Sequence, residues 1–351
     1  MKILITGVAG FIGMHLCRRL CAEHEITGID NLSGITYEQS LKIDRLSELG
    51  LHLGSLEADH LKSGQPVSSE CLTFCLMDLC DRNAVGNLIA EGGFDLIINL
   101  AALAGVRLSS SIPDQYMASN VTGFFNILES LRELKLKAEH DSTVKCPRLI
   151  FASSSSVYGE CSEVPFSESN TDINPVSVYA ATKKIDETLA RTYASLFKID
   201  SIALRFFTVY GPFGRPDMAP FIFTRKLHSG QPIHLFNHGR QRRDYTYIDD
   251  IVEGIAAIAQ GPDQSGSAIP FDVFNIGNGS PVDLGDFVAT LEEISGIRAQ
   301  VILDDKQLGD VDQTWADVSR LMEKYHFRPH TTLKEGLTRF YQWYLGYYGR
   351  K

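Results

Sequence analysis

The N-terminal segment constrains the fold more strongly than any other part of the chain. The apolar run Lys2–Thr6 leads into Gly7-Val8-Ala9-Gly10-Phe11-Ile12-Gly13, and an amphipathic stretch then extends to Ala22. Glycines between a strand and a helix allow a tight turn and let a pyrophosphate approach the N–H groups at the helix N-terminus. A second apolar run, Glu25–Asp30, follows and ends in a carboxylate that can accept hydrogen bonds from a ribose. The segment therefore predicts a dinucleotide-binding unit.

The first half of the chain continues this alternation of short apolar runs and longer amphipathic stretches. Such alternation favours a parallel sheet with helices on both faces. The expected strands are Lys2–Thr6, Glu25–Asp30, Leu72–Asp78, Phe94–Leu100, Arg148–Ser153 and Ser201–Phe206. The expected helices are Phe11–Ala22, Tyr37–Leu49, Arg82–Glu91, Gln115–Leu136 and Val178–Phe197. The segment Leu53–Ser69 is predicted to be a surface loop. The predicted fold class is α/β, a Rossmann-type doubly wound parallel sheet with a smaller α/β substrate domain.

The pattern changes after Phe206, where a loop rich in Gly and Pro leads to a helix near Phe221–Leu227. A polar segment then runs to Asp244, the strand candidate Phe271–Ile276 rejoins the first sheet, and a helix near Leu333–Tyr347 follows. We therefore expect a discontinuous arrangement. Residues 1–206, rejoined by about 247–278, form the predicted NAD-binding domain, and residues 207–246 and 279–351 form the smaller domain.

Composition argues against several classes of protein. The chain has 33 Lys and Arg against 43 Asp and Glu, a net charge of −10, which argues against a nucleic-acid partner. No signal peptide is visible, and the longest mostly apolar uncharged stretch, 96–106, is shorter than the roughly 20 residues that span a bilayer. Seven cysteines, an odd number, predict reduced thiols in a cytoplasmic protein. Cys71, Cys75 and Cys80 read as buried core residues rather than zinc ligands, so no metal is expected.

The predicted cofactor is NAD rather than NADP, because the carboxylate of Asp30 would repel a 2′-phosphate. The alternative is an ordinary glycine turn with Asp30 as a helix cap. Asp78 either meets the adenine or caps the helix that follows it. The predicted contacts lie at the glycine turn and at the ends of three strands, and they are Gly7, Gly10, Phe11, Ile12, Gly13, Asp30, Asn31, Asp78, Leu79, Leu100, Ala101 and Ala102.

Tyr179 and Lys183 lie four residues apart on a predicted helix, so their side chains share one face. A phenol ionises near pH 10 and is a poor base at neutral pH, but a neighbouring ammonium favours the phenolate. Such a tyrosine can remove the proton from an alcohol while hydride leaves the same carbon. The strand ending near Ser153 leads into further serines, whose hydroxyls can bind the reacting alcohol. The structural alternatives are a surface Tyr/Lys pair and a polar strand end.

Taken together, these motifs resemble the extended short-chain dehydrogenase/reductase superfamily, within its nucleotide-sugar epimerases and dehydratases, over essentially the whole chain. The resemblance rests on Thr6–Gly13, Ser154–Tyr158, Tyr179 with Lys183, and Arg243–Asp250. It implies that Ser154, Tyr179 and Lys183 are catalytic and that the last two also contact NAD. The UDP-glucuronate 4-epimerases match best, on segments 104–107, 205–212, 214–219 and 237–239.

This resemblance implies an isomerase that interconverts UDP-glucuronate and UDP-galacturonate through a 4-keto intermediate, with NAD tightly bound and recycled. Arg243 would hold the diphosphate, Asp310 the uridine ribose, and Arg107 would assist at the phosphates. The residues expected around the sugar carboxylate are Ser155, Ser156, Thr208 and Arg215. The structural alternatives are a solvated loop arginine for Arg215 and a strand-end hydroxyl for Thr208.

The resemblance also implies a homodimer formed by two long helices, and polysaccharide biosynthesis is a natural setting for a galacturonate donor. The chain departs from the family at Asn99, usually His, at Leu308, usually Pro, and in a longer segment Lys135–Pro147. Alternative functions are a UDP-glucose or UDP-N-acetylhexosamine 4-epimerase, a UDP-glucuronate decarboxylase, and a non-catalytic NAD or nucleotide-sugar sensor. A dehydratase fits less well, because its usual acidic pair is replaced by Ser155 and Ser156.

Overall fold

The computed structural model describes residues 1–54, 64–171, 173–264, 266–305 and 311–349. Contacts divide the chain into two compact units. Unit 1 comprises Met1–Val157, Pro175–Arg205 and Ile255–Phe274, and unit 2 comprises Tyr158–Asn174, Phe206–Gly254 and Asn275–Lys351. The chain thus passes between the units several times. The division departs from the predicted boundaries in two places, because residues 158–174 belong to unit 2 and the return to unit 1 begins only at Ile255.

Unit 1 is built on a sheet that, among the described residues, has eight strands in the order β12-β7-β6-β5-β1-β2-β4-β3. The pairs β1–β2, β1–β5, β2–β4 and β5–β6 are parallel, and β3 is antiparallel to β4. The strands are β1 Lys2–Thr6, β2 Glu25–Asp30, β3 Val67–Ser68, β4 Thr73–Leu76, β5 Leu96–Asn99, β6 Arg148–Ser154, β7 Ser201–Phe206 and β12 Phe271–Ile276. The strand order reverses between β1 and β5, so their carboxyl ends flank the position where open α/β sheets bind ligands.

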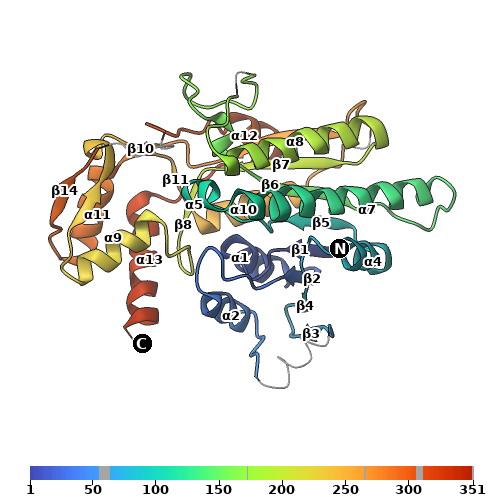
Figure 1. The fold of residues 1–351 in the computed structure, drawn as a ribbon, viewed down its shortest axis with the longest axis horizontal. Coiled ribbons are helices and arrows are strands. Elements are labelled where there is room, and N and C mark those ends of the chain that lie inside the picture. The colour runs from blue at the N-terminus through green and yellow to red at the C-terminus, as the bar shows by residue number, and fades with distance from the viewer. Residues whose placement is uncertain (55–63, 172, 265, 306–310, 350–351) are drawn as a thin grey trace. The chain divides into compact units, whose positions relative to one another are not determined.

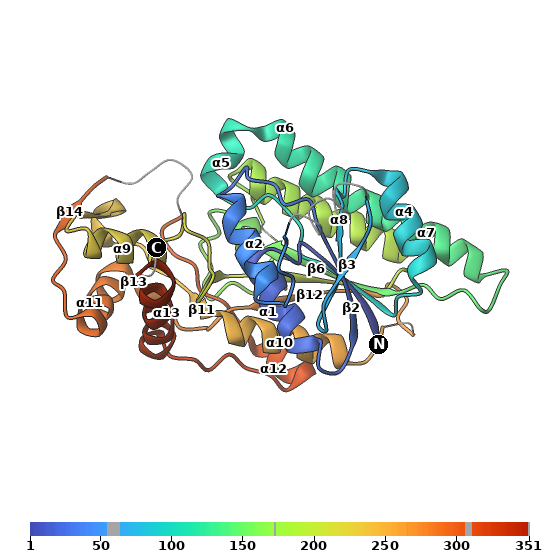
Figure 2. The same ribbon diagram turned by 90° about the horizontal axis from the view of Figure 1, so that it is seen from below.

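Helices cover both faces of this sheet, as the sequence predicted. Figures 1 and 2 show α4, α7 and α8 on one face, with α1 and α10 on the other. The helices are α1 Phe11–Leu20, α2 Gln39–Ser47, α4 Arg82–Gly92, α5 Val106–Ser111, α6 Pro113–Tyr116, α7 Gly123–Ala138, α8 Val178–Phe197 and α10 Ile248–Gln260. The single helix predicted over Gln115–Leu136 is instead α6, the π-helical turn η1 (Met117–Thr122) and α7. The predicted loop Leu53–Ser69 includes the short strand β3 and otherwise lies partly outside the described residues.

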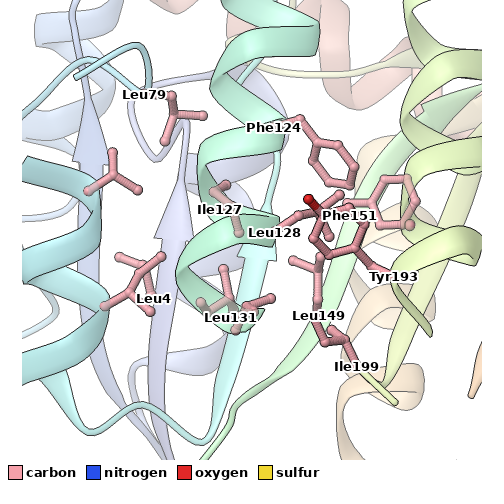
Figure 3. Packing of buried hydrophobic residues seen from close by; sticks show 14 of the residues in the cluster. Leu4, Leu79, Phe124, Ile127, Leu128, Leu131, Leu149, Phe151, Tyr193 and Ile199 are labelled. Carbon is pink, nitrogen blue, oxygen red and sulfur yellow. The ribbon is translucent and has the colours of Figure 1, made fainter. Parts of the chain in front are cut away.

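The main core of unit 1 lies between the sheet and the α4, α7 and α8 face (Figure 3). Ile127 and Leu131 of α7 and Leu149 of β6 belong to one buried cluster, and the rings of Phe124 and Phe151 lie 4.7 Å apart. Each fully buried side chain of this size contributes about 1.5–3 kcal/mol relative to exposure. The core therefore holds β6 and α8 in fixed positions, and these two elements carry the serine, tyrosine and lysine that the sequence singled out.

Unit 2 consists of helices and short paired strands. Its elements are β8 Thr208–Tyr210, α9 Ala219–His228, β9 Ile233–Leu235, the 3₁₀ turn η3 Phe236–Gly239, β10 Arg242–Arg243, β11 Tyr245–Tyr247, β13 Val282–Asp283, α11 Leu284–Ser295, β14 Val301–Leu303, α12 Ser319–Tyr325 and α13 Leu333–Tyr348. β8 pairs with β11, β9 with β14 and β10 with β13. The polar segment predicted before Asp244 therefore contains two strands. Aromatic contacts join α13 to α9, such as Phe221 to Phe340 at 5.0 Å between ring centres.

The structure differs from the cysteine predictions in two respects. Cys21, which ends α1, forms a disulfide with Cys71, and their Cα atoms lie 5.1 Å apart. The expectation that every thiol is reduced is therefore wrong. Cys80 is exposed and Cys75 is half-buried, so neither fits the buried-core interpretation. Within the described ranges, no group of His, Cys, Asp and Glu is arranged to hold a metal ion. No helix in this part of the chain is both long and apolar enough to cross a bilayer.

Candidate functional site

The glycine turn after β1 has the tight geometry that its sequence predicted. Gly7 has a φ of 71°, and a Cβ there would lie 2.7 Å from the backbone nitrogen of Ala101. A Cβ on Gly13 would collide with the carbonyl oxygen of Gly7. The first intrahelical bond of α1 is the one that Met14 N donates to Gly10 O, at 3.0 Å. The preceding N–H groups, together with a first turn that has no acidic residue and no capping side chain, leave the helix end suited to an anion.

Asp30 lies buried at the end of β2, where it is held by two hydrogen bonds. Its Oδ1 accepts from Leu32 N at 2.8 Å and from Lys42 Nζ of α2 at 3.0 Å. Asp30 does not cap α2, because Glu38 holds that position. Lys42 was not singled out from the sequence, where a lysine twelve residues after Asp30 carries no distinctive signal. Its ammonium fixes the carboxylate and offsets part of the negative charge on which the preference for NAD rests.

Asp78 is part of a link between the ends of β2 and β4. Asn31 Nδ2 donates to Asp78 Oδ2 at 2.9 Å, and Cys80 N donates to Asp78 Oδ1 at 2.8 Å. Burial raises the pKa of Asp78, but these hydrogen bonds outweigh it and hold the pKa below its usual value. The cap of α4 is Asp81, which accepts from Ala84 N, so the helix-cap alternative for Asp78 is wrong.

The residues after β5 are tied to the end of β1. Leu100 N donates to Thr6 O at 3.1 Å, and Ala101 N donates to Thr6 Oγ1 at 3.2 Å. Asn99 is buried and accepts a hydrogen bond from the same threonine hydroxyl through Oδ1. The asparagine at this position therefore has a structural role in joining two strand ends. It leaves Ala101 and Ala102, both half-buried, next to the glycine turn.

Ser154, Tyr179 and Lys183 lie on two elements that pack together, β6 and α8. Ser154 ends β6, is buried, and accepts from Ser156 N at 3.2 Å. Tyr179 is half-buried in the first turn of α8, with its ring edge-to-face with that of Tyr116 at 6.3 Å. Lys183, one turn further along, is buried, and its Nζ lies 3.3 Å from Asp186 Oδ2. Polar groups capable of proton transfer are thus placed on rigid elements of unit 1.

A buried ion pair beside this group was missed from the sequence. Glu187 receives two hydrogen bonds from Arg205 of β7, from Nε and Nη2, each at 2.8 Å. Ser153 Oγ donates to the same carboxylate at 2.7 Å. The carboxylate therefore ties α8 to β6 and β7. In β7 the signal was a single arginine in an apolar run, whereas α8 has several charged residues and nothing in its sequence singled out Glu187.

Three predicted substrate-binding residues of unit 1 lie nearer the surface than Ser154. Ser155 and Ser156 are half-buried in the 3₁₀ turn η2 (Ser155–Tyr158), directly after β6. Arg107 is exposed on α5. The hydroxyls of Ser155 and Ser156 thus directly follow that of Ser154. The side chain of Arg107 is accessible to solvent.

In unit 2, Arg243 lies on β10 and contacts backbone carbonyls of a neighbouring segment. Its Nη2 donates to Val311 O at 2.8 Å, and its Nη1 donates to Asp312 O at 3.2 Å. These two residues directly follow Asp310 in the sequence, although Asp310 and Leu308 lie outside the described residues. Thr208 begins β8 in the same unit, where its N–H donates to Asp244 O at 3.1 Å.

Asp244 is a buried anchor for the strand that carries Arg243. Its carboxylate accepts from the N–H groups of Asn278 at 2.7 Å, Gly279 at 3.0 Å and Ala316 at 3.0 Å. Burial raises the pKa of Asp244, and these hydrogen bonds offset only part of that effect. The side chain therefore organises the turn after Arg243.

Arg215 is not a solvated loop arginine, because its side chain is only 20% exposed and is paired with Asp217. Both oxygens of Asp217 accept from the guanidinium, with Nε to Oδ1 at 3.0 Å. This fork is the geometry in which an arginine binds a carboxylate. A substrate carboxylate at this position would have to exchange with that of Asp217.

The sequence matches the NAD dependent epimerase/dehydratase family over residues 3–277. It is 41% identical to Protein CapI from Staphylococcus aureus, with 99% of each chain covered. It is 38% identical to UDP-glucuronate 4-epimerase 2 from Arabidopsis thaliana, over 99% of this chain and 76% of that one. The structure resembles UDP-glucuronic acid 4-epimerase from Bacillus cereus in complex with UDP-glucuronic acid and NAD, with a TM-score of 0.83, 32% identity and 98% of each chain covered. On these matches, and with the glycine turn in the required place, the chain belongs to the NAD dependent epimerase/dehydratase family.

Proposed function

We propose that this chain is an NAD-dependent isomerase that converts UDP-glucuronate to UDP-galacturonate by inverting carbon 4. The likeness of the whole chain to UDP-glucuronate 4-epimerases carries the proposal. The buried serine and lysine beside a half-buried tyrosine in unit 1 supply the proton-transfer groups that such chemistry needs.

NAD fits the residues of unit 1. The glycine cradle has no room for a Cβ at Gly7 or Gly13, and the N-terminus of α1 suits a pyrophosphate. Asp30 stands where a ribose would be bound. When bound, NAD supplies an acceptor for the hydride of carbon 4 and returns it later. Because the cofactor would be regenerated in each turnover, it would not need to leave, and we expect it to be tightly bound.

The chain's own residues move the proton. The phenolate of Tyr179 takes the proton of the 4-hydroxyl as hydride leaves the same carbon, and the hydroxyl of Ser154 binds the resulting ketone oxygen. The ammonium of Lys183 favours the phenolate by its charge. After the flat 4-keto sugar has turned to present its other face, hydride returns to carbon 4 on that face and Tyr179 returns the proton to the oxygen, so the configuration is inverted.

The substrate-binding residues in this proposal are those that the resemblance assigns. Arg243 holds the diphosphate, with help from Arg107, and Asp310 holds the uridine ribose. The 4-keto intermediate of a glucuronate is a β-keto acid, which loses CO₂ most easily when the breaking bond is perpendicular to the carbonyl plane. The groups that hold the carboxylate away from that alignment are Ser155, Ser156, Thr208 and Arg215.

Arg215→Ala and Thr208→Val enzymes should release more CO₂ per epimerisation than the wild type, because each has lost a donor to the carboxylate. Released CO₂ and UDP-pentose are measured beside UDP-galacturonate in the same reaction. Arg298→Ala is the matched control, since that arginine is 90% exposed. Unchanged epimerisation and unchanged CO₂ release in both variants would remove these two residues from the carboxylate site.

The function itself is tested by proton NMR of the purified protein with UDP-glucuronate and no added cofactor. UDP-galacturonate, formed with constant total sugar, is the expected product and also shows that NAD was retained. A UDP-pentose product would instead indicate a decarboxylase. If nothing changes even with NAD supplied, UDP-glucose and UDP-N-acetyl sugars test the neutral-sugar epimerases, and inactivity with all of them leaves the sensor.

We also infer a cytoplasmic homodimer that binds neither nucleic acid nor membrane and that serves polysaccharide biosynthesis. The helices predicted to pair two copies are α7 and α8, and they carry apolar side chains at the surface, with Leu136 41% and Leu196 66% exposed. The mass in solution by light scattering tests the dimer, and a monomer at micromolar concentration would contradict it.

A further inference from the structure

One stripe of α8 carries more charge than a buried helix face normally holds. Residues 179, 183, 186, 187 and 190 recur with the spacing of one helix face, and all but the half-buried Tyr179 are buried. Three of the five are the charged residues Lys183, Asp186 and Glu187. Charged side chains are almost never fully buried unless they are paired, so each of these needs a partner.

Glu187 is fully engaged, because Arg205 and Ser153 bind its carboxylate and the partly exposed Lys184 lies 3.5 Å away. Lys183 and Asp186 form an ion pair with each other. Their side chains are 2% and 1% exposed, and Lys183 Nζ lies 3.3 Å from Asp186 Oδ2. The other oxygen, Oδ1, is buried and has no hydrogen-bond partner among the described residues. The carboxylate of Asp186 therefore rests on a single long contact.

The charges that act on Asp186 are those of Lys183 and Glu187. The elements packed most closely against α8 are β6, α5, α6, η1 and α7, and β7 reaches it through Arg205, which binds Glu187. On α7, Glu129 is already bound by Arg132 and by the hydroxyl of Tyr193. The other titratable or charged residues of these elements are Arg107 on α5, Asp114 and Tyr116 on α6, Glu133, Lys135 and Lys137 on α7, and Arg148 on β6.

Burial raises the pKa of Asp186 to about 7, with Glu187 adding to the rise and Lys183 opposing it. The carboxyl thus changes its charge in the neutral range, beside the lysine on which the proposed proton transfer depends. A protonated carboxyl leaves the ammonium free to act on Tyr179, whereas an ionised one competes for it.

We infer that Asp186 is a positioning residue whose carboxylate is a second partner for the Lys183 ammonium and, on ionising, draws that charge away from Tyr179. The inference rests on the proposed function, in which Lys183 favours the phenolate. It makes the proton transfer sensitive to pH through a group that touches neither substrate nor cofactor. Because the ionisations of Asp186 and Tyr179 are coupled, the rate rises over a wider pH range than the ionisation of a single group would give.

The test is the pH profile of kcat for the wild type and for Asp186→Asn, which keeps the shape and removes the charge. We expect the rising limb of Asp186→Asn to move to lower pH by about 0.5–1 unit, the effect of removing one nearby charge in a medium of intermediate dielectric constant. The slope of this rising limb should also increase to the slope expected for the ionisation of a single group. Glu133→Gln, which removes one carboxylate from α7, should leave it in place. Asp186→Ala serves if the asparagine variant does not fold.

A second readout needs no substrate. Phenolate absorbance is measured as a function of pH for the wild type and for Asp186→Asn. The same titration is repeated for each protein with Tyr179→Phe added, and the difference between the two curves is the signal of Tyr179. Ionisation at lower pH in the variant is expected. The inference would be overturned if neither the rising limb of the kcat profile nor the absorbance titration moved in Asp186→Asn, or if both moved to higher pH. This holds even if kcat falls equally at every pH. Failure of the proposed function shows separately, as a wild type without UDP-glucuronate turnover or as an active Tyr179→Phe enzyme.

Discussion

The Tyr179→Phe enzyme is expected to turn over UDP-glucuronate about 10²–10⁴-fold more slowly than the wild type, which is the usual contribution of a positioned general base. Phenylalanine keeps the ring that packs edge-to-face with Tyr116 and removes only the hydroxyl. The first half-reaction then has no group to accept the proton of the 4-hydroxyl. The variant should still bind NAD, because the glycine turn, Asp30 and Lys183 are unchanged. The measurements are kcat by NMR and NAD content after denaturation.

Tyr348→Phe is the matched control, because it makes the same chemical change on α13, at an exposed residue. It should retain the wild-type rate. The melting temperature of both variants shows whether the fold is intact. A folded Tyr179→Phe enzyme that retains activity within a few-fold would remove Tyr179 from its role as the base. A folded wild type without activity would favour the sensor instead.

The sequence predicted the elements of unit 1 well where periodicity and glycine punctuation agree. β1, β2, β7, β12 and α8 have the predicted ends, because each is a short apolar run or a capped amphipathic stretch between turn residues. α8, for example, begins after Ser177, whose hydroxyl accepts from Ala180 N. Local sequence was sufficient at these places because local and tertiary preferences coincide.

Of the helical regions that were not predicted correctly, two show different reasons. The predicted helix Gln115–Leu136 is interrupted by η1, where Asn120 bonds to both backbone groups of Leu103 and to Thr182. A side chain that forms hydrogen bonds with a distant loop cannot be recognised from hydrophobic periodicity. α10, Ile248–Gln260, was not predicted at all, although its apolar residues lie mainly on one side. It follows directly after β11, so no turn residue marks where the helix begins.

The candidate site divides in the same way. The tight turn at Gly7 and Gly13 and the carboxylate at the end of β2 could be located from the sequence, because backbone geometry demands glycine in such a turn. Their partners could not be predicted. Lys42 and Asp217 meet Asp30 and Arg215 only in the folded chain, and the same holds for Glu187 with Arg205. Sequence patterns point to the groups proposed to act, whereas the residues that hold those groups in place are known only from tertiary contacts.

Breaking the Glu187–Arg205 pair should lower the free energy of unfolding by about 3–5 kcal/mol, because either single variant leaves an uncompensated buried charge. The variants are Glu187→Leu and Arg205→Met. The double variant should lose less than the sum of the two, since both charges are then absent and apolar side chains fill the space. Urea titration of the three proteins at neutral pH measures this. Glu335→Ala is the control. It breaks an ion pair with Arg339 whose side chains are about half exposed, and it should cost no more than about 1 kcal/mol.

The pH dependence of this loss identifies the charge as its cause. Burial raises the pKa of Glu187, but the hydrogen bonds from Arg205 and Ser153 outweigh it and hold the pKa below its usual value. A depressed pKa in the folded state stabilises the protein above the unfolded value of about 4.3, and that stability is lost as the pH falls below it. The deficit of Glu187→Leu relative to the wild type should therefore be constant near pH 7 and shrink below about pH 4. A deficit that is the same at both pH values would mean that packing around Glu187, rather than its charge, joins α8 to β6 and β7.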